Sequence, residues 1–244
     1  WRIELASLPA ELGIPHARVI NDFYAVGAGL PYLDADGVAV LHQGVPQPRG
    51  VRALLGAGTG LGHGFLTWSE RGYTVHASEG GHVDLAALTE RQWRLRQALA
   101  MMHGRVSAER VLSGAGLIAL YRFVVTEGGG TADETVRVPA DVSVRALAGT
   151  DAACVAALEM FVEVYGAVAG NFALTVLATG GLYVGGGIAP QILPKLRDGT
   201  FMRAFLEKGR LRSVLKRIPV HVITSPDVAL YGAAALAARM AGDQ

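Results

Sequence analysis

The sequence predicts a mixed α/β protein in which short apolar strands meet helices or other strands at glycine turns. Glycine occupies every second position from 56 to 64 between two apolar runs, which is typical of a strand–turn–strand. The apolar run 182–184 leads through the glycines 185–187 into a helix with Pro190 near its first position. The longest predicted helix, residues 151–178, precedes that strand. In open α/β sheets the carboxyl ends of the strands are where ligands bind, so these turns are candidate sites.

The composition fits a globular protein with a substantial core. Of the 244 residues, 51% are hydrophobic and 18% are charged, and the formal net charge is +1. With neither a basic block nor an acidic tail, nothing indicates nucleic acid or an anionic membrane as a partner. The single cysteine, Cys154, excludes an internal disulfide and a cysteine zinc cluster, and it favours a reducing, cytoplasmic setting.

One stretch resembles a membrane span, because no charged residue occurs between Glu163 and Lys195. Glycines at 180–181 and 185–187 interrupt it, and the unbroken helical piece is therefore predicted to be too short to cross a bilayer. We expect a buried helix that leads into a buried strand.

The first fifty residues contain two polar candidates, Asn21 and Asp22. A short helix is predicted over 7–13, and a strand over 17–20 passes directly into Asn21, Asp22 and a second helix. Asp22 then lies either at the ligand-binding end of a strand or at a plain helix N-cap. The loop-rich segment 31–50 that follows is a plausible domain boundary.

The glycine run 56–64 suits a phosphate group, because exposed N–H groups in a glycine turn form a nest for anions. Gly58, Thr59 and Gly60 form its tip, and Thr59 adds a hydroxyl. No Gly-Lys-Ser/Thr follows, and a strand stands where the dinucleotide fingerprint needs a helix. The alternative is a glycine-rich hairpin or bulge that binds no ligand.

A second polar cluster follows the predicted strand 73–76, where Glu79 and His82 flank two glycines. Converging polar groups on one tight turn suit a polyhydroxylated or otherwise polar small molecule. Because His76 precedes Glu79 by three residues, a metal site is also conceivable, but a turn does not place the three side chains on one face. A surface turn with a solvated glutamate is the third reading.

The remaining elements place two more candidates. Glu109 lies in a turn opened by Ser107, where it is either a partner of the helix dipole or a buried ligand contact, and sequence alone favours the former. The turn from Gly185 to Ile188 lets a nucleotide lie against bare backbone. Helices are also predicted over 89–103, 113–126 and 227–240, and a last strand over 218–223.

Five motifs occur in a characteristic order: Asn21-Asp22-Phe23, Gly56-Ala57-Gly58-Thr59-Gly60-Leu61-Gly62, Glu79-Gly80-Gly81-His82, the segment from Ser107 to Gly114, and Gly185-Gly186-Gly187-Ile188-Ala189-Pro190. Together they resemble the bacterial glucokinase family of the hexokinase and actin-like ATPase superfamily. Each motif alone is weak, whereas five in order over nearly the whole chain are specific.

The resemblance implies a ribonuclease H-like (actin-like ATPase/hexokinase) fold of two domains closing on a cleft. Residues 33–224 would form the large α/β domain, and residues 1–32, completed by the C-terminal helix 225–244, would belong to the small one. The family's first phosphate loop, of the Asp-x-Gly-Gly-Thr type, has no counterpart here, so we expect an N-terminally truncated member. The absence of a cysteine-rich zinc motif implies the zinc-free branch.

The resemblance also implies the activity, an ATP-dependent transfer of the γ-phosphoryl group to the 6-hydroxyl of glucose. Asp22 would be the general base, with Asn21, Glu79, His82 and Glu109 as sugar ligands. The nucleotide would lie on Gly58, Thr59 and Gly60 and on Gly185, Gly186, Gly187 and Ile188, with Mg²⁺ between its phosphates. A catalytically silent sugar-binding or regulatory protein on this scaffold and a kinase for another hexose are the alternatives. The expected partners are glucose and ATP, with a homodimer left open.

Overall fold

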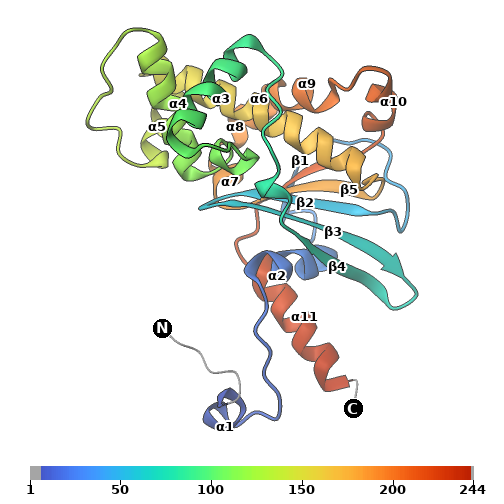
Figure 1. Cartoon of the computed structure of the whole chain (residues 1–244). Helices are drawn as coiled ribbons and strands as arrows, with labels where there is room; N and C mark the ends of the chain where they lie inside the picture. The colour runs from blue at the N-terminus through green and yellow to red at the C-terminus, as the bar shows by residue number, and fades with distance from the viewer. Residues whose placement is uncertain (1–6, 243–244) are drawn as a thin grey trace.

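The computed structural model describes residues 7–242, and these are built around one six-stranded sheet (Figure 1). Its spatial order is β1-β6-β5-β2-β3-β4, with β2 parallel to β5, β5 parallel to β6, and antiparallel pairing elsewhere. The strands are β1 (Val38–His42), β2 (Arg52–Ala57), β3 (Leu61–Ser69), β4 (Gly72–Ser78), β5 (Gly181–Gly185) and β6 (Val220–Ile223). This mixed α/β architecture is the predicted fold class.

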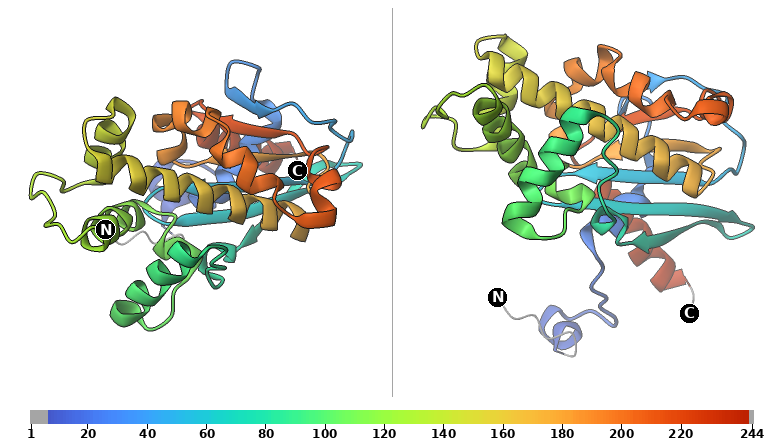
Figure 2. Two further views of the ribbon diagram at one scale, coloured as in Figure 1. Left: turned by 90° about the horizontal axis from the view of Figure 1, so that it is seen from above. Right: turned by 45° about the horizontal axis from the view of Figure 1, so that its top comes forward.

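Helices cover the two faces of the sheet unequally, as Figures 1 and 2 show. One face carries α3 (Glu90–His103), α4 (Gly114–Glu127), α5 (Pro139–Ala148), α6 (Ala152–Thr175), α7 (Ile188–Gln191), α8 (Leu193–Arg197), α9 (Thr200–Leu206) and α10 (Arg212–Leu215). The other face carries α2 (Asp22–Gly29) and α11 (Val228–Gly242), while α1 (Leu8–Leu12) lies apart from the sheet. Four single 3-10 turns complete the list for residues 7–242: η1 (Leu30–Tyr32), η2 (Gly80–His82), η3 (Ala108–Arg110) and η4 (Gly209–Leu211).

The helix α6 is the centre of the larger core. Cβ atoms at Gly166 and Gly170 would overlap the backbone carbonyls of Phe201 and Phe205, so these glycines let α9 approach closely. The uncharged helical piece that follows Glu163 ends at Thr175 and is short, as expected, although the whole of α6 is long and apolar enough to cross a membrane by length and composition. However, 61% of its apolar window is buried inside the protein, as in the core helix of a globular domain. The predicted burial of this helix and of β5 is confirmed.

The chain's two end segments meet on the other face of the sheet, where α2 packs on α11 (Figure 1). A Cβ at Gly232 would overlap the carbonyl oxygen of Ala25, so the two helices touch through backbone. A small second core lies beneath them, formed by Leu30, Leu54, Leu66, Ile223 and Val228. Residues 1–6 and 243–244 of the predicted small domain lie outside the described residues.

One sequence prediction about an element is wrong, and another is incomplete. Residues 17–20 are not a strand, because in the described chain no neighbouring strand pairs with them. The segment 31–50 is not only a loop, because it contains β1, which pairs with β6 from Val38 opposite Ile223 onward. In both cases the outcome depends on a neighbouring strand. A strand forms only where a second strand pairs with it, and the local sequence does not reveal whether such a strand lies close by.

Candidate active site

The candidate site is a cleft at the ends of two neighbouring strands of the sheet, from which the chain continues in opposite directions. The strands β2 and β5 are parallel neighbours, but the chain leaves β2 for β3 on one side and leaves β5 for β6 on the other. Such a switch point opens a crevice beyond the carboxyl ends of the strands. Here a cleft of about 500 Å³ lies there, and it is lined by Asn21, Asp22, Thr59, Glu79, His82 and Glu109 among others.

Asn21 and Asp22 enter the cleft from the first turn of α2. The side-chain oxygen of Asn21 accepts hydrogen bonds from the backbone N–H groups of Phe23 and Tyr24, at 3.0 and 3.1 Å. Asn21, not Asp22, is therefore the helix cap. Asp22 uses Oδ1 to accept the Phe23 N–H at 2.8 Å, which leaves its other oxygen directed to solvent in the cleft.

The glycine face of the β2–β3 hairpin is filled by an aromatic ring. Gly56 stands opposite Gly62 in the ladder, and Cβ atoms there would lie 2.6 and 2.8 Å from ring atoms of Phe23. The bare strand face thus receives the residue that follows Asp22. This contact holds the start of α2 against the sheet, which sequence reasoning did not foresee.

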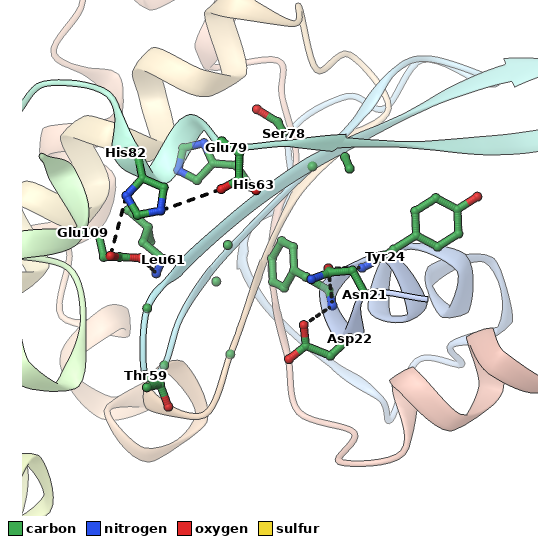
Figure 3. Close-up of a pocket in the computed structure, with 18 of the residues that line it drawn as sticks. Asn21, Asp22, Tyr24, Thr59, Leu61, His63, Ser78, Glu79, His82 and Glu109 are labelled. Carbon is green, nitrogen blue, oxygen red and sulfur yellow. Dashed lines mark hydrogen bonds and ion pairs between the residues drawn. The ribbon is translucent and has the colours of Figure 1, made fainter. Parts of the chain in front are cut away.

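Glu79, His82 and Glu109 lie across the glycine strands from Asp22 (Figure 3). His82 stands between the two carboxylates, with Nε2 3.8 Å from Glu79 Oε2 and Nδ1 3.7 Å from Glu109 Oε1. Glu109 also accepts the Leu61 N–H at 3.0 Å, which ties it to the end of the glycine turn. The Glu79 side chain is 92% exposed, so its carboxylate is free to bind a ligand.

The predicted phosphate and nucleotide residues reach the cleft only in part. Gly58, Thr59 and Gly60 line it, and Gly186 and Gly187 do so from the turn after the neighbouring strand β5. The structure does not bring Gly185 or Ile188 to it: Gly185 is buried within β5, and Ile188 packs on the main core. The switch from strand to turn therefore exposes backbone one residue later than the motif suggested.

A buried histidine beside the cleft was missed in the sequence. His63 in β3 is 6% exposed, its ring lies 4.6 Å from that of Phe172, and it neighbours the Glu79 turn (Figure 3). Neither ring nitrogen has a hydrogen-bond partner among the described residues. Burial lowers the pKa of His63 to about 4, so the ring is neutral at physiological pH. Its one signal in the sequence was a polar residue between two glycines of a strand.

No metal cage is evident within residues 7–242. No group of three His, Cys, Asp or Glu side chains there is arranged to hold an ion. His76, the third member of the conceivable metal set, instead stacks on Phe65 and has its Nε2 2.8 Å from the Thr67 hydroxyl. Mg²⁺ commonly binds through one or two carboxylates and substrate phosphates, and the exposed Asp22 in the same cleft as the glycine turn suits that mode.

Solved structures give the class of protein. A glucokinase of the ROK family from Streptomyces griseus, in complex with glucose and AMPPNP, matches with a TM-score of 0.61 at 20% identity, over 95% of this chain and 70% of that one. A glucokinase from an Antarctic psychrotroph matches with a TM-score of 0.87 at 34% identity, over 97% of this chain and 73% of that one. The fold is therefore that of the actin-like ATPase class of sugar kinases.

Sequence comparisons are more specific. The glucokinase family model matches residues 1–240. A glucokinase from Nostoc punctiforme is 41% identical over 98% of this chain and 76% of its own length. The chain belongs to the glucokinase family, as the five motifs predicted.

Proposed function

We propose that this chain acts as a glucokinase, transferring the γ-phosphoryl group of ATP to the 6-hydroxyl of glucose, the entry step of glycolysis. Membership of the glucokinase family supports the reaction. The observation that carries the assignment to residues is the arrangement of the cleft. Asp22 stands on one side, Glu79, His82 and Glu109 on the other, and the Thr59 turn lies at the end between them.

Asp22 is the general base in this proposal. Its Oδ1 is held by the Phe23 N–H, so the carboxylate has a fixed direction while Oδ2 is available to a hydroxyl proton. Phosphoryl transfer requires in-line placement of the hydroxyl and the phosphoryl group more than covalent help from the protein. A carboxylate anchored at a helix start meets that requirement.

The other four polar residues hold the sugar. Asn21 has its oxygen engaged in capping, so its amide N–H₂ is the group left to donate to a hydroxyl. Glu109, His82 and Glu79 form a row of acceptors and a donor opposite, which suits adjacent ring hydroxyls. A site of this kind rejects sugars that leave its polar groups unpaired.

ATP would lie against the bare backbone at the ends of β2 and β5. The N–H groups of the Gly58–Gly60 turn suit phosphate oxygens, and Gly186 and Gly187 leave room beside them. The AMPPNP complex of the Streptomyces griseus protein supports a nucleotide on this fold. Mg²⁺, when bound, neutralises charge on the transferred phosphoryl oxygens.

The arrangement of the elements suggests how the cleft closes. The segment 33–224 contains the sheet and the helices above it, and would be the large domain. The helices α2 and α11 pack on each other below the sheet and would belong to a small domain, formed by residues 1–32 and 225–244. Closure of the two would exclude water, the competing acceptor. The buried Cys154 and a sequence without a basic block fit a cytoplasmic enzyme.

The test is a pair of measurements on the purified chain. Calorimetry with glucose and with ATP measures binding, and a coupled assay follows sugar phosphate formation from glucose, mannose, fructose and glucosamine. The proposal expects glucose to be the preferred substrate. Preference for another sugar would reassign the substrate, and glucose binding without ATP binding or turnover would support the silent sugar-binding alternative.

A further inference from the structure

A buried tyrosine hydroxyl lies where the two central strands separate. Pairing of β2 with β5 runs from Arg52 opposite Gly181 to Gly56 opposite Gly185 and then stops. After Gly185 the chain turns away at Gly186, whose φ is +80°. A Cβ at Gly186 would overlap the carbonyl of Ala57, so the two diverging segments are still in backbone contact at this point.

This divergence leaves one backbone donor of β2 without a strand partner. Gly58 N donates to Gly60 O at 2.8 Å across the hairpin. Because hydrogen-bonding directions alternate along a strand, the neighbouring Ala57 N–H faces the other edge, toward β5. There β5 has already left the ladder. A buried N–H in that position requires another acceptor.

Tyr165 of α6 supplies the acceptor for the Ala57 N–H. Its hydroxyl accepts the Ala57 N–H at 3.0 Å and lies 3.5 Å from the Gly185 carbonyl, to which it can donate. The ring is fully buried and packs edge-on against Phe161 and Phe201, each with centroids 5.7 Å away. One hydroxyl thus joins the last paired residue of β5 to the last residue of β2, from the face of the sheet that α6 covers.

We propose that Tyr165 is a positioning residue for the nucleotide half of the site, an inference that rests on the proposed function. It does not line the cleft. It fixes the spacing between the Gly58–Gly60 turn and the Gly186–Gly187 turn, the two backbone segments against which the nucleotide lies. The glucose ligands Glu79 and His82 reach the cleft from other elements, whereas Glu109 touches the glycine turn through the Leu61 N–H. This spacing should therefore affect ATP binding more than glucose binding.

The chain offers a matched control for the substitution Tyr165→Phe. Tyr121 of α4 is also buried, and its hydroxyl accepts the backbone N–H of Asp133 at 3.0 Å, outside the cleft. Tyr121→Phe therefore removes the same chemical group and the same kind of hydrogen bond. The Asp133 N–H is less buried than the Ala57 N–H, so Tyr121→Phe controls for the loss of a buried tyrosine hydroxyl that accepts a backbone N–H.

The experiment measures Kd for ATP and for glucose by calorimetry, together with amide hydrogen exchange by segment. Tyr165→Phe is expected to raise the Kd for ATP roughly three- to tenfold, the effect of one buried hydrogen bond, with the glucose Kd within about twofold. Exchange should quicken in residues 56–60 and 185–188. Tyr121→Phe should change neither Kd and should quicken exchange only around residue 133.

Equal changes in both Kd values, or equal effects of the two variants on ATP, would reduce Tyr165 to a purely structural residue. Unaltered exchange at 56–60 and 185–188 would overturn the positioning role directly. The exchange measurement needs no turnover. A wild-type chain that binds neither ligand would therefore count against the proposed function, while the exchange data would still decide whether Tyr165 fixes these two turns.

Discussion

The ring of Phe23 occupies the space that a side chain at Gly62 would need. A Cβ at Gly62 would lie 2.8 to 2.9 Å from three atoms of that ring, and one at Gly56 would lie 2.6 Å from a fourth. The residue next to Asp22 is thus seated in a groove that only glycine leaves open. The position of the proposed base depends on this contact between α2 and the hairpin.

The first prediction concerns this contact. Gly62→Ala should lower the free energy of unfolding by roughly 1–3 kcal/mol, the usual cost of overpacking, and should reduce kcat by displacing the start of α2. Chemical denaturation and a coupled kinase assay measure the two effects. Phe23→Ala opens the groove, so in its background Gly62→Ala should be less destabilising by about 1 kcal/mol. Strict additivity of the two substitutions would show that ring and glycine do not interact.

The second prediction concerns Asp22 itself. Asp22→Asn keeps an acceptor for the Phe23 N–H and removes the base, so kcat should fall by about 10²- to 10⁴-fold with glucose affinity little changed. A coupled assay and glucose calorimetry follow the two quantities. Asp151→Asn is the matched control, because Asp151 also accepts N–H groups at a helix start, at 2.8 and 3.0 Å, and lies outside the cleft. Turnover within threefold of wild type would remove Asp22 from the role of base.

The sequence predicted the location of the site better than its internal contacts. Alternating glycines and polar residues at strand ends indicated which segments approach a ligand, and the structure brings Asn21, Asp22, Glu79, His82 and Glu109 to one cleft. The pattern could not show that Phe23 fills the glycine face. A strand face without side chains indicates that another group approaches it, but it does not indicate which group.

Strand pairing and the contacts of buried side chains could not be predicted from the local sequence. The strand β1 lies in a segment rich in glycine and proline and exists because β6 is beside it. For Glu109 the local sequence favours a partner of a helix dipole over a buried ligand contact, whereas its carboxylate accepts the N–H of Leu61, 48 positions earlier in the chain. Both depend on contacts between distant segments, which composition and periodicity do not encode.

The third prediction separates two tasks of Glu109. Its Oε2 accepts the Leu61 N–H, and its Oε1 faces His82. Glu109→Gln retains an acceptor for Leu61, so the free energy of unfolding should stay within about 0.5 kcal/mol while the Kd for glucose rises about tenfold. Glu109→Ala should lower both the free energy of unfolding and the affinity for glucose. Calorimetry with glucose and chemical denaturation measure these effects. Loss of stability in both variants with unchanged glucose binding would make Glu109 a structural residue.

The fourth prediction concerns His63 and pH. Burial lowers the pKa of this imidazole from its ordinary value of 6.5 to about 4. Below pH 6.5 the unfolded chain takes up a proton that the folded chain refuses, so the free energy of unfolding falls as the pH drops from 6.5 to 4 and is unaffected by this group above 6.5. The full effect is on the order of 3 kcal/mol. His63→Gln should flatten that part of the stability curve, measured by denaturation at several pH values. The exposed His103, changed to Gln in the same way, should leave the slope as it is. An unchanged slope in His63→Gln would mean that the folded protein admits a proton at this ring, in conflict with its burial against Phe172.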